Sequence, residues 1–112
     1  MKTKFAYLEA LRKRVLFFDG ATGTNLEEKN LTPADFGEPG LFGLFDALPY
    51  YAPTVVAELH RSFFEAGADV IETDSFRSNR LTLNQFGASP RVYDFNLAAA
   101  EVARLVADEF ST

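Results

Sequence analysis

Two clusters of small and polar residues in this sequence have the composition of a small-molecule site. The first, Asp19–Thr24, reads Asp-Gly-Ala-Thr-Gly-Thr, so a carboxylate adjoins glycines that let a ligand approach the backbone closely. The second, Glu72–Phe76, reads Glu-Thr-Asp-Ser-Phe and groups two carboxylates with two hydroxyls. A carboxylate beside free N–H groups suits a zwitterionic amino acid, because each end of the ligand meets the opposite charge. A plain turn, with Asp and Thr as helix caps, explains the first cluster equally well.

Other chemistries have weaker support in the sequence. The first cluster lacks the Gly-Lys-Ser/Thr ending of a phosphate-binding P-loop, and it is not the G-x-G-x-x-G dinucleotide motif. Glu72 and Thr73 should point to opposite sides of a strand, so we expect only one of them to face a ligand. His60 is the only histidine and lies in the middle of a predicted helix, where we expect a surface or packing residue rather than a base or a metal ligand.

Predicted parallel strands place both clusters at one edge of a sheet. Val15–Phe18 is a continuous apolar run, which is typical of a strand buried on both faces, and Asp69–Thr73 predicts a second strand. A helix is predicted between them at Pro53–Ala66, with Gly67 just after its end. This β-α-β unit should have a right-handed crossover, and α/β folds bind ligands at the carboxyl ends of such strands.

The remaining segments are predicted to be helices and one long loop. Residues 31–52 are rich in Pro and Gly and therefore predict a loop, within which the apolar Leu41–Phe45 should fold back over its own barrel or a partner. The expected helices are an N-terminal one capped by Thr3 with a Phe5, Leu8, Leu11 stripe, a short one at Asn25–Lys29, and two more at Asn79–Phe86 and Arg91–Phe110. The basic run Arg12–Arg14 is expected to form the solvated last turn of the first helix.

Composition excludes several classes of function. The net charge of −5 gives the chain no electrostatic basis for binding nucleic acid or an anionic membrane. The sequence has no cysteine, which excludes disulfides and thiolate metal sites within it. No apolar run approaches the roughly 18 residues of a membrane-spanning helix, and no apolar stretch follows Met1–Lys4 as a signal peptide requires. We therefore expect a cytoplasmic protein.

The two clusters and the helix between them resemble the homocysteine S-methyltransferase family. Val15–Thr24 is similar to the family's first strand and loop, and Pro53–Phe76 to its second strand region. Ser78–Arg80 and Asn96–Ala100 extend the likeness, which covers nearly all of the chain from Val15 onward. The resemblance implies an α/β fold of the (βα)8 TIM-barrel type, which takes about 250 residues. Residues 1–112 would then be an N-terminal helix and the first two βα units of a homocysteine-binding domain.

The resemblance also implies roles for particular residues. Asp19 and Gly20 would contact the amino acid group of homocysteine, and Thr73 and Ser75 would line the same site. The family's zinc activates the thiol through cysteine ligands in later strands, and cobalamin with methyltetrahydrofolate serves its cobalamin-dependent members. We therefore expect no catalytic residue, metal ligand or cofactor in this chain, and no methyl transfer by it alone, so that its standing as an enzyme is open.

Two departures from the family pattern affect the site. Asp74 stands where the family usually has Asn, which adds a carboxylate near the ligand, and Leu44-Phe45 follows Gly43 where the family usually has Asn.

A second hypothesis concerns a protein of a different class. Two strands cannot bury their own faces, and the sequence ends on a predicted helix with no third strand. The chain would then be a small, non-catalytic α/β protein that assembles with copies of itself rather than with the remainder of a barrel. An unrelated, phosphate-binding barrel is a third alternative.

Overall fold

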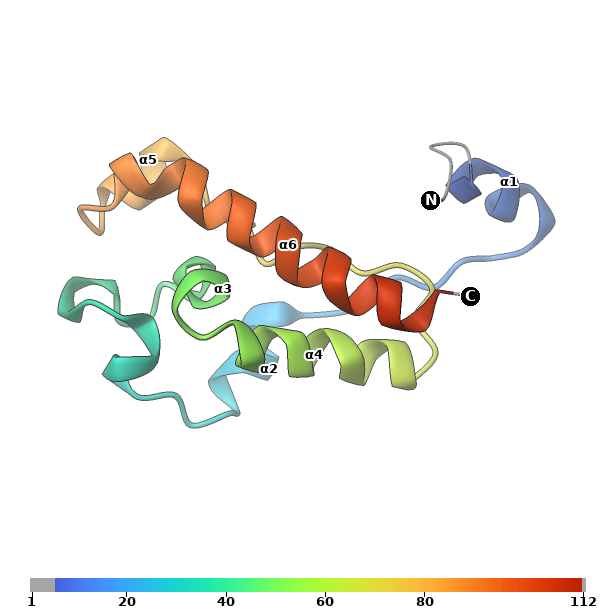
Figure 1. Ribbon diagram of the computed structural model, residues 1–112, viewed down its shortest axis with the longest axis horizontal. Coiled ribbons are helices and arrows are strands. Elements are labelled where there is room, and N and C mark those ends of the chain that lie inside the picture. Colours follow the sequence, from blue (N-terminus) through green and yellow to red (C-terminus); the bar gives the residue numbers. More distant parts are fainter. Residues whose placement is uncertain (1–5, 112) are drawn as a thin grey trace.

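Two long helices, α4 (Pro53–Glu65) and α6 (Val92–Phe110), pack against each other and form the body of the molecule (Figure 1). The computed structural model describes residues 6–111. The shorter α-helices are α1 (Ala6–Lys13), α2 (Thr22–Glu27), α3 (Leu48–Tyr51) and α5 (Arg80–Asn84). Four 3₁₀ turns join them: η1 (Pro33–Phe36), η2 (Pro39–Leu41), η3 (Phe45–Ala47) and η4 (Ser89–Arg91). None of the helices within residues 6–111 combines the length and the hydropathy that a membrane-spanning helix requires.

The predicted apolar faces of α4 and α6 form the centre of the core. Val56 and Leu59 of α4 are buried, as are Phe95 and Val106 of α6. Both helices begin and end within one residue of the predicted positions. For α4, Pro53 and Gly67 mark these positions in the sequence. The predicted Asn79–Phe86 helix is shorter, with Asn79 accepting the N-terminal hydrogen bond from the Thr82 N–H at 3.0 Å.

The two segments that were predicted to be strands run parallel where they meet, but neither forms a regular strand. Phe18 and Val70 make one isolated parallel bridge, in which the Asp19 N–H donates to the Val70 carbonyl at 3.0 Å and the Val70 N–H to the Phe17 carbonyl at 3.2 Å. The parallel alignment is therefore present, whereas the two βα units are not confirmed. The predicted burial of the first strand is wrong, since Val15 is 72% and Phe17 65% exposed. Within residues 6–111 no further strand pairs with either segment to cover it.

The predicted loop at residues 31–52 is largely structured. It contains η1, η2, η3 and α3, and its Leu41 and Leu44 lie in the hydrophobic core. The prediction that Leu41–Phe45 folds back is confirmed, and it covers this chain's own core. The short helix after the first cluster, α2, begins at Thr22 rather than at the predicted Asn25.

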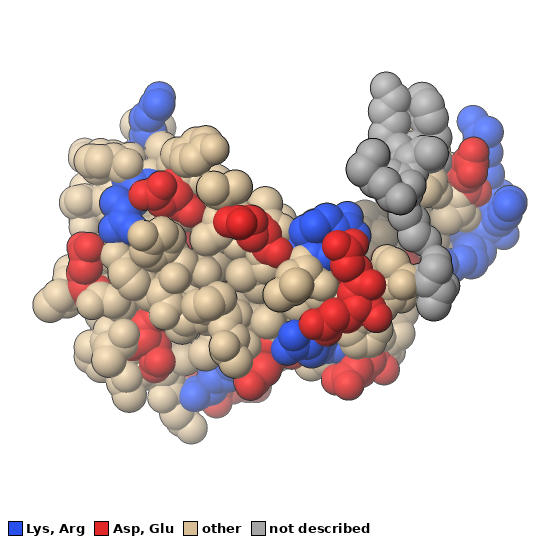
Figure 2. Space-filling view, in the orientation of Figure 1, with Lys and Arg blue, Asp and Glu red and all other residues tan. Residues whose placement is uncertain are grey.

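Helix α1 lies to one side of the body in Figure 1. Its predicted apolar stripe is wrong as a buried face, because Leu8 and Leu11 are 49% and 47% exposed. Phe5 and the capping Thr3 lie outside the described residues. As predicted, Arg12 and Lys13 form the basic last turn of this helix, and basic side chains gather at its end of the molecule in Figure 2.

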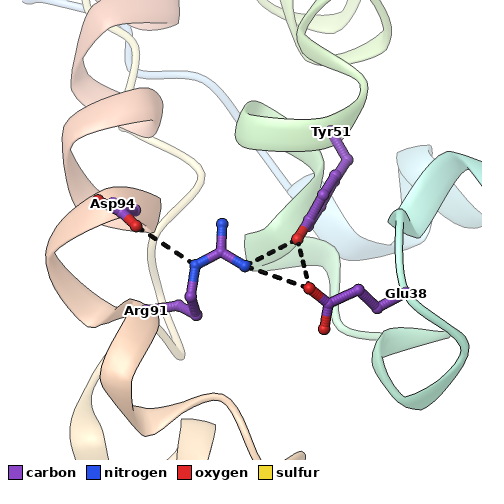
Figure 3. Close-up of polar contacts among 4 residues, drawn as sticks. All are labelled: Glu38, Tyr51, Arg91 and Asp94. Atoms are coloured by element: carbon purple, nitrogen blue, oxygen red, sulfur yellow. Dashed lines mark hydrogen bonds and ion pairs between the residues drawn. The ribbon is translucent and has the colours of Figure 1, made fainter.

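A polar cluster centred on Arg91 joins the 31–52 segment to the start of α6 (Figure 3). The Arg91 Nη1 donates to the Tyr51 hydroxyl at 2.8 Å and to the Glu38 carboxylate at 3.4 Å. The Tyr51 hydroxyl donates to the same Glu38 oxygen at 3.0 Å, and the Arg91 Nε donates to Asp94 at 3.3 Å. The guanidinium also lies over the Tyr50 ring, 4.6 Å from its centroid. One side chain thereby connects three elements.

Replacing Arg91 with alanine should lower the free energy of unfolding by about 2 kcal/mol, because hydrogen bonds to charged groups contribute about 1.5–3 kcal/mol. Urea unfolding of Arg91→Ala against the unmodified protein measures this. The matched control is Arg104→Ala, whose exposed ion pair with Asp108, four residues along α6, should contribute less than about 0.5 kcal/mol. Equal losses in the two variants would contradict a structural role for the Arg91 cluster.

Candidate functional site

The two clusters predicted from the sequence line one pocket of about 400 Å³. Thr22 and Gly23 come from the first cluster, and Asp74 and Phe76 from the second. The parallel bridge explains this meeting, because the chain leaves Phe18 and Val70 in the same direction and both clusters follow at one edge. The remaining lining residues are Glu27, Gly43, Phe45, Asp46 and Arg77.

Asp19 is not among the residues that line the pocket, but its side chain connects the two clusters. Its Oδ2 accepts a hydrogen bond from the Glu72 N–H at 3.1 Å. Its Oδ1 is buried and has no hydrogen-bond partner among residues 6–111. A Cβ added at Gly20 would lie 3.4 Å from the ring of Phe63 in α4. Helix α4 therefore packs closely against this loop. The carboxylate is therefore held by the second cluster and keeps one oxygen free.

Thr73 and Ser75 form a hydroxyl pair outside the pocket lining. Their Oγ1 and Oγ atoms are 2.6 Å apart, and the Ser75 N–H donates to the Thr73 carbonyl at 2.9 Å. None of the four predicted site residues lines the pocket itself; all four belong to the two segments that do.

A buried pair of acids, Asp46 and Asp74, dominates the electrostatics of the pocket. The two residues are only 3% and 5% exposed. Asp46 is neutralised by Arg77, whose backbone N–H donates to Oδ2 at 2.8 Å and whose Nε lies 3.7 Å from Oδ1. Asp74 has no such partner, and its Oδ2 is buried without a hydrogen bond in the described part of the chain.

The environment of the pair raises both pKa values. Burial raises the pKa of Asp74 to about 8, the negative charge of Asp46 adds to the effect, and Arg77 opposes it. Burial also raises the pKa of Asp46, against the hydrogen bond from the Arg77 backbone. At neutral pH Asp74 is therefore mainly protonated and carries no charge.

Asp46 and Arg77 were not predicted as site residues. A signal for Asp46 existed, because it directly follows the apolar Leu41–Phe45 and an acid in a buried run needs a partner. Arg77 directly follows the second cluster, but no pattern in the sequence connects it with Asp46.

His60 is buried in α4, 2% exposed, one turn before the Phe63 that supports Gly20. Burial lowers its pKa, and the charge of Asp19 opposes that shift. The expected packing role agrees with this position.

The residues of this chain do not fit a zinc site of the kind the resemblance implies. The sequence has no cysteine, and no group of three His, Asp or Glu side chains in residues 6–111 could hold a metal ion. The two acids that line the pocket, Asp46 and Asp74, are accompanied there by the cationic Arg77, which pairs with Asp46. A metal ligand set is therefore not assigned to this pocket.

Comparison with known sequences identifies relatives. The sequence model of the family described as homocysteine S-methyltransferase matches residues 16–112. The methionine synthases of Mycobacterium leprae and Mycobacterium tuberculosis are 40% and 39% identical to this chain over 105 residues, which is 94% of it. The same alignments cover 8% and 9% of those two proteins, so the chain spans less than a tenth of their length.

Proposed function

Because the chain belongs to the homocysteine S-methyltransferase family, we propose that residues 1–112 form the N-terminal part of a homocysteine-binding barrel domain. In this proposal the parallel contact between Phe18 and Val70 is the beginning of the barrel's sheet. The exposed Val15 and Phe17 would be covered by strands from the remainder of the barrel. The chain contributes substrate-binding groups to a methyl transfer reaction, and it does so at the edge where both clusters lie.

Asp19 and Gly20 contact the amino acid group of homocysteine, and Thr73 and Ser75 line the same site. The observation that carries this proposal is the meeting of both clusters at one pocket, together with a buried Asp19 oxygen that has no hydrogen-bond partner within residues 6–111. A hydrogen bond from a ligand would satisfy that oxygen, which otherwise costs stability. The paired hydroxyls of Thr73 and Ser75 can each reorient to donate or accept.

Activation of the thiol belongs to another part of the protein. A thiolate is the nucleophile in sulfur chemistry, and this chain has no group that would hold the family's zinc. We therefore assign zinc and the methyl donor to segments outside residues 1–112, and we expect no methyl transfer by these residues alone.

Replacing Asp19 with asparagine should weaken homocysteine binding by about 10- to 100-fold, because a charge-assisted hydrogen bond contributes about 1.5–3 kcal/mol. Isothermal titration of homocysteine into the full-length native protein measures the change. Asp108→Asn is the matched control, since its exposed carboxylate pairs with Arg104 on α6 and its loss should leave binding unchanged. Equal affinity of Asp19→Asn and the unmodified protein would overturn the assigned role.

One observation favours the self-assembling alternative. Val15, Phe17 and Phe76 are 72%, 65% and 95% exposed, and exposed apolar side chains favour association. A second copy of the chain could cover them in place of barrel strands. Light scattering that shows only a folded monomer at high concentration would exclude this alternative.

A further inference from the structure

We propose that Asp46 and Asp74 form an ammonium-binding pair, in which Asp74 gives up its proton when the ammonium group of an amino acid ligand enters the pocket. The proposal rests on the function proposed above, because it states how that site recognises the charged nitrogen of its substrate. It adds two acids to the four residues already assigned to substrate binding.

Once Asp74 is ionised, the hydrogen bonds of the pocket leave one of its oxygens as an acceptor without a partner among residues 6–111. Both oxygens of Asp46 face Arg77, at 2.8 Å from its backbone nitrogen and 3.7 Å from its Nε. The Arg77 Nη2 also donates to the Gly43 carbonyl at 3.2 Å, which fixes the guanidinium against the pocket wall. Asp74 is only 5% exposed in the same surroundings and lines the pocket, yet its Oδ2 has no partner within residues 6–111. A buried polar atom without a partner points to a missing ligand or water.

The charges around that acceptor favour a cation. The titratable and charged groups lining the pocket are Glu27 on α2, Asp46 on η3, and Asp74 and Arg77 in the second cluster and directly after it. Arg77 is the one cation among them and is engaged by Asp46. An ionised Asp74 would therefore be an uncompensated buried charge, which is why it holds its proton while the pocket contains no cation. An ammonium group supplies the missing positive charge.

The aromatic side chains of the pocket fit the same ligand. Phe45 and Phe76 both line it, and ammonium groups bind favourably over aromatic rings. An anionic group would instead be repelled by the ionised acids and by the negative faces of the rings.

The proton balance of the step is simple. The O–H bond of the Asp74 carboxyl breaks, its proton passes to the buffer, and the resulting carboxylate accepts a hydrogen bond from the ligand's ammonium. No covalent bond to the ligand forms, and nothing is oxidised or reduced. Because the pKa of Asp74 is about 8, the carboxyl is almost fully protonated at pH 6.5, so close to one proton should leave for each ligand bound.

Titration calorimetry in buffers of different ionisation enthalpy measures that proton directly. The ligand is methionine, which has no thiol, so any released proton comes from the protein. At pH 6.5 its α-ammonium group is protonated. The full-length native protein should release close to one proton per methionine, and 4-(methylthio)butanoate, which lacks the ammonium, should release none. This comparison requires no variant.

Two variants locate the source of the proton. Asp74→Asn should bind methionine at least about 10-fold more weakly and release no proton, since the loss of a charged hydrogen bond costs about 1.5–3 kcal/mol. Glu72→Gln, a matched loss of an exposed acid two residues away, should keep the release. Methionine binding without proton release, or equal release by Asp74→Asn, would overturn this inference alone. Failure of the native protein to bind either homocysteine or methionine would overturn the proposed function and this inference with it.

Discussion

Replacing Gly37 with alanine is expected to lower the free energy of unfolding by roughly 3–5 kcal/mol, the sum of backbone strain and overpacking. Gly37 has φ 82° and ψ −61°, and the Glu38 N–H donates to the Phe36 carbonyl around it at 3.0 Å. This is the rare γ-turn conformation that side chains disfavour. A Cβ at this position would lie 2.2–2.4 Å from atoms of the Tyr51 ring. The ring would have to move, and its hydroxyl would leave Glu38 and Arg91.

Two other glycines separate the strain from the clash. Gly43 has φ 90°, but no atom lies within 4 Å of the place a Cβ would take, so alanine there should cost only the backbone strain, about 1–3 kcal/mol. Gly40 has neither a positive φ nor a close neighbour, so Gly40→Ala should change stability by less than about 0.5 kcal/mol. Chemical denaturation of the three variants gives the comparison. A loss at Gly37 no larger than at Gly43 would show that Tyr51 does not lie where the structure places it.

Replacing Asp74 with asparagine should stabilise the protein by a few kcal/mol at pH 8, since each pKa unit corresponds to about 1.4 kcal/mol. The pKa of Asp74 is raised to about 8 from an ordinary value near 3.8. Below the ordinary value the carboxyl is protonated in both states, so its full contribution to stability is present. As the pH rises toward 8, only the unfolded chain loses the proton, and the free energy of unfolding falls. Asparagine mimics the protonated acid and removes this fall.

The measurement is urea unfolding of both proteins between pH 4 and pH 9. The gain in Asp74→Asn should be small at pH 4, grow with pH and level off above pH 8. Glu72→Gln controls for the loss of a nearby carboxylate, because Glu72 is exposed and its removal should not change the pH slope. Parallel pH profiles for Asp74→Asn and the unmodified protein would contradict a buried, proton-holding Asp74.

The two long helices were predictable because their signals are local. Pro53 begins α4 and Gly67 follows its end, and the apolar spacing along α6 selects the face that is buried. The outcome for the two predicted strands was not predictable. Val15–Phe18 has the composition of a buried strand, but such a strand needs neighbouring strands on both sides. Only one bridge partner, Val70, is present in the described residues. Strand formation thus depends on segments far away in the chain or outside it. The local composition carries no information about those segments.

The meeting of the two clusters was predictable, while the chemistry of the pocket that they line was only partly so. The parallel direction of the two segments is enough to place both clusters at one pocket. Asp74 was recognisable as an added acid, but its proton depends on burial and on Asp46, which lies 28 positions earlier in the sequence. The contact between Asp46 and Arg77 arises because the 31–52 segment folds over the core. Long-range contacts of this kind leave no periodic pattern.

The central claim is that the edge formed by the two clusters holds the amino acid group of homocysteine. A crystal structure of the full-length native protein with bound homocysteine tests it most directly. The account predicts that the ligand's amino acid group lies within hydrogen-bonding distance of Asp19 and of the Gly20 backbone, with its ammonium reaching Asp74 and with Thr73 and Ser75 lining the same site. Homocysteine bound at an edge that contains neither cluster would contradict the account.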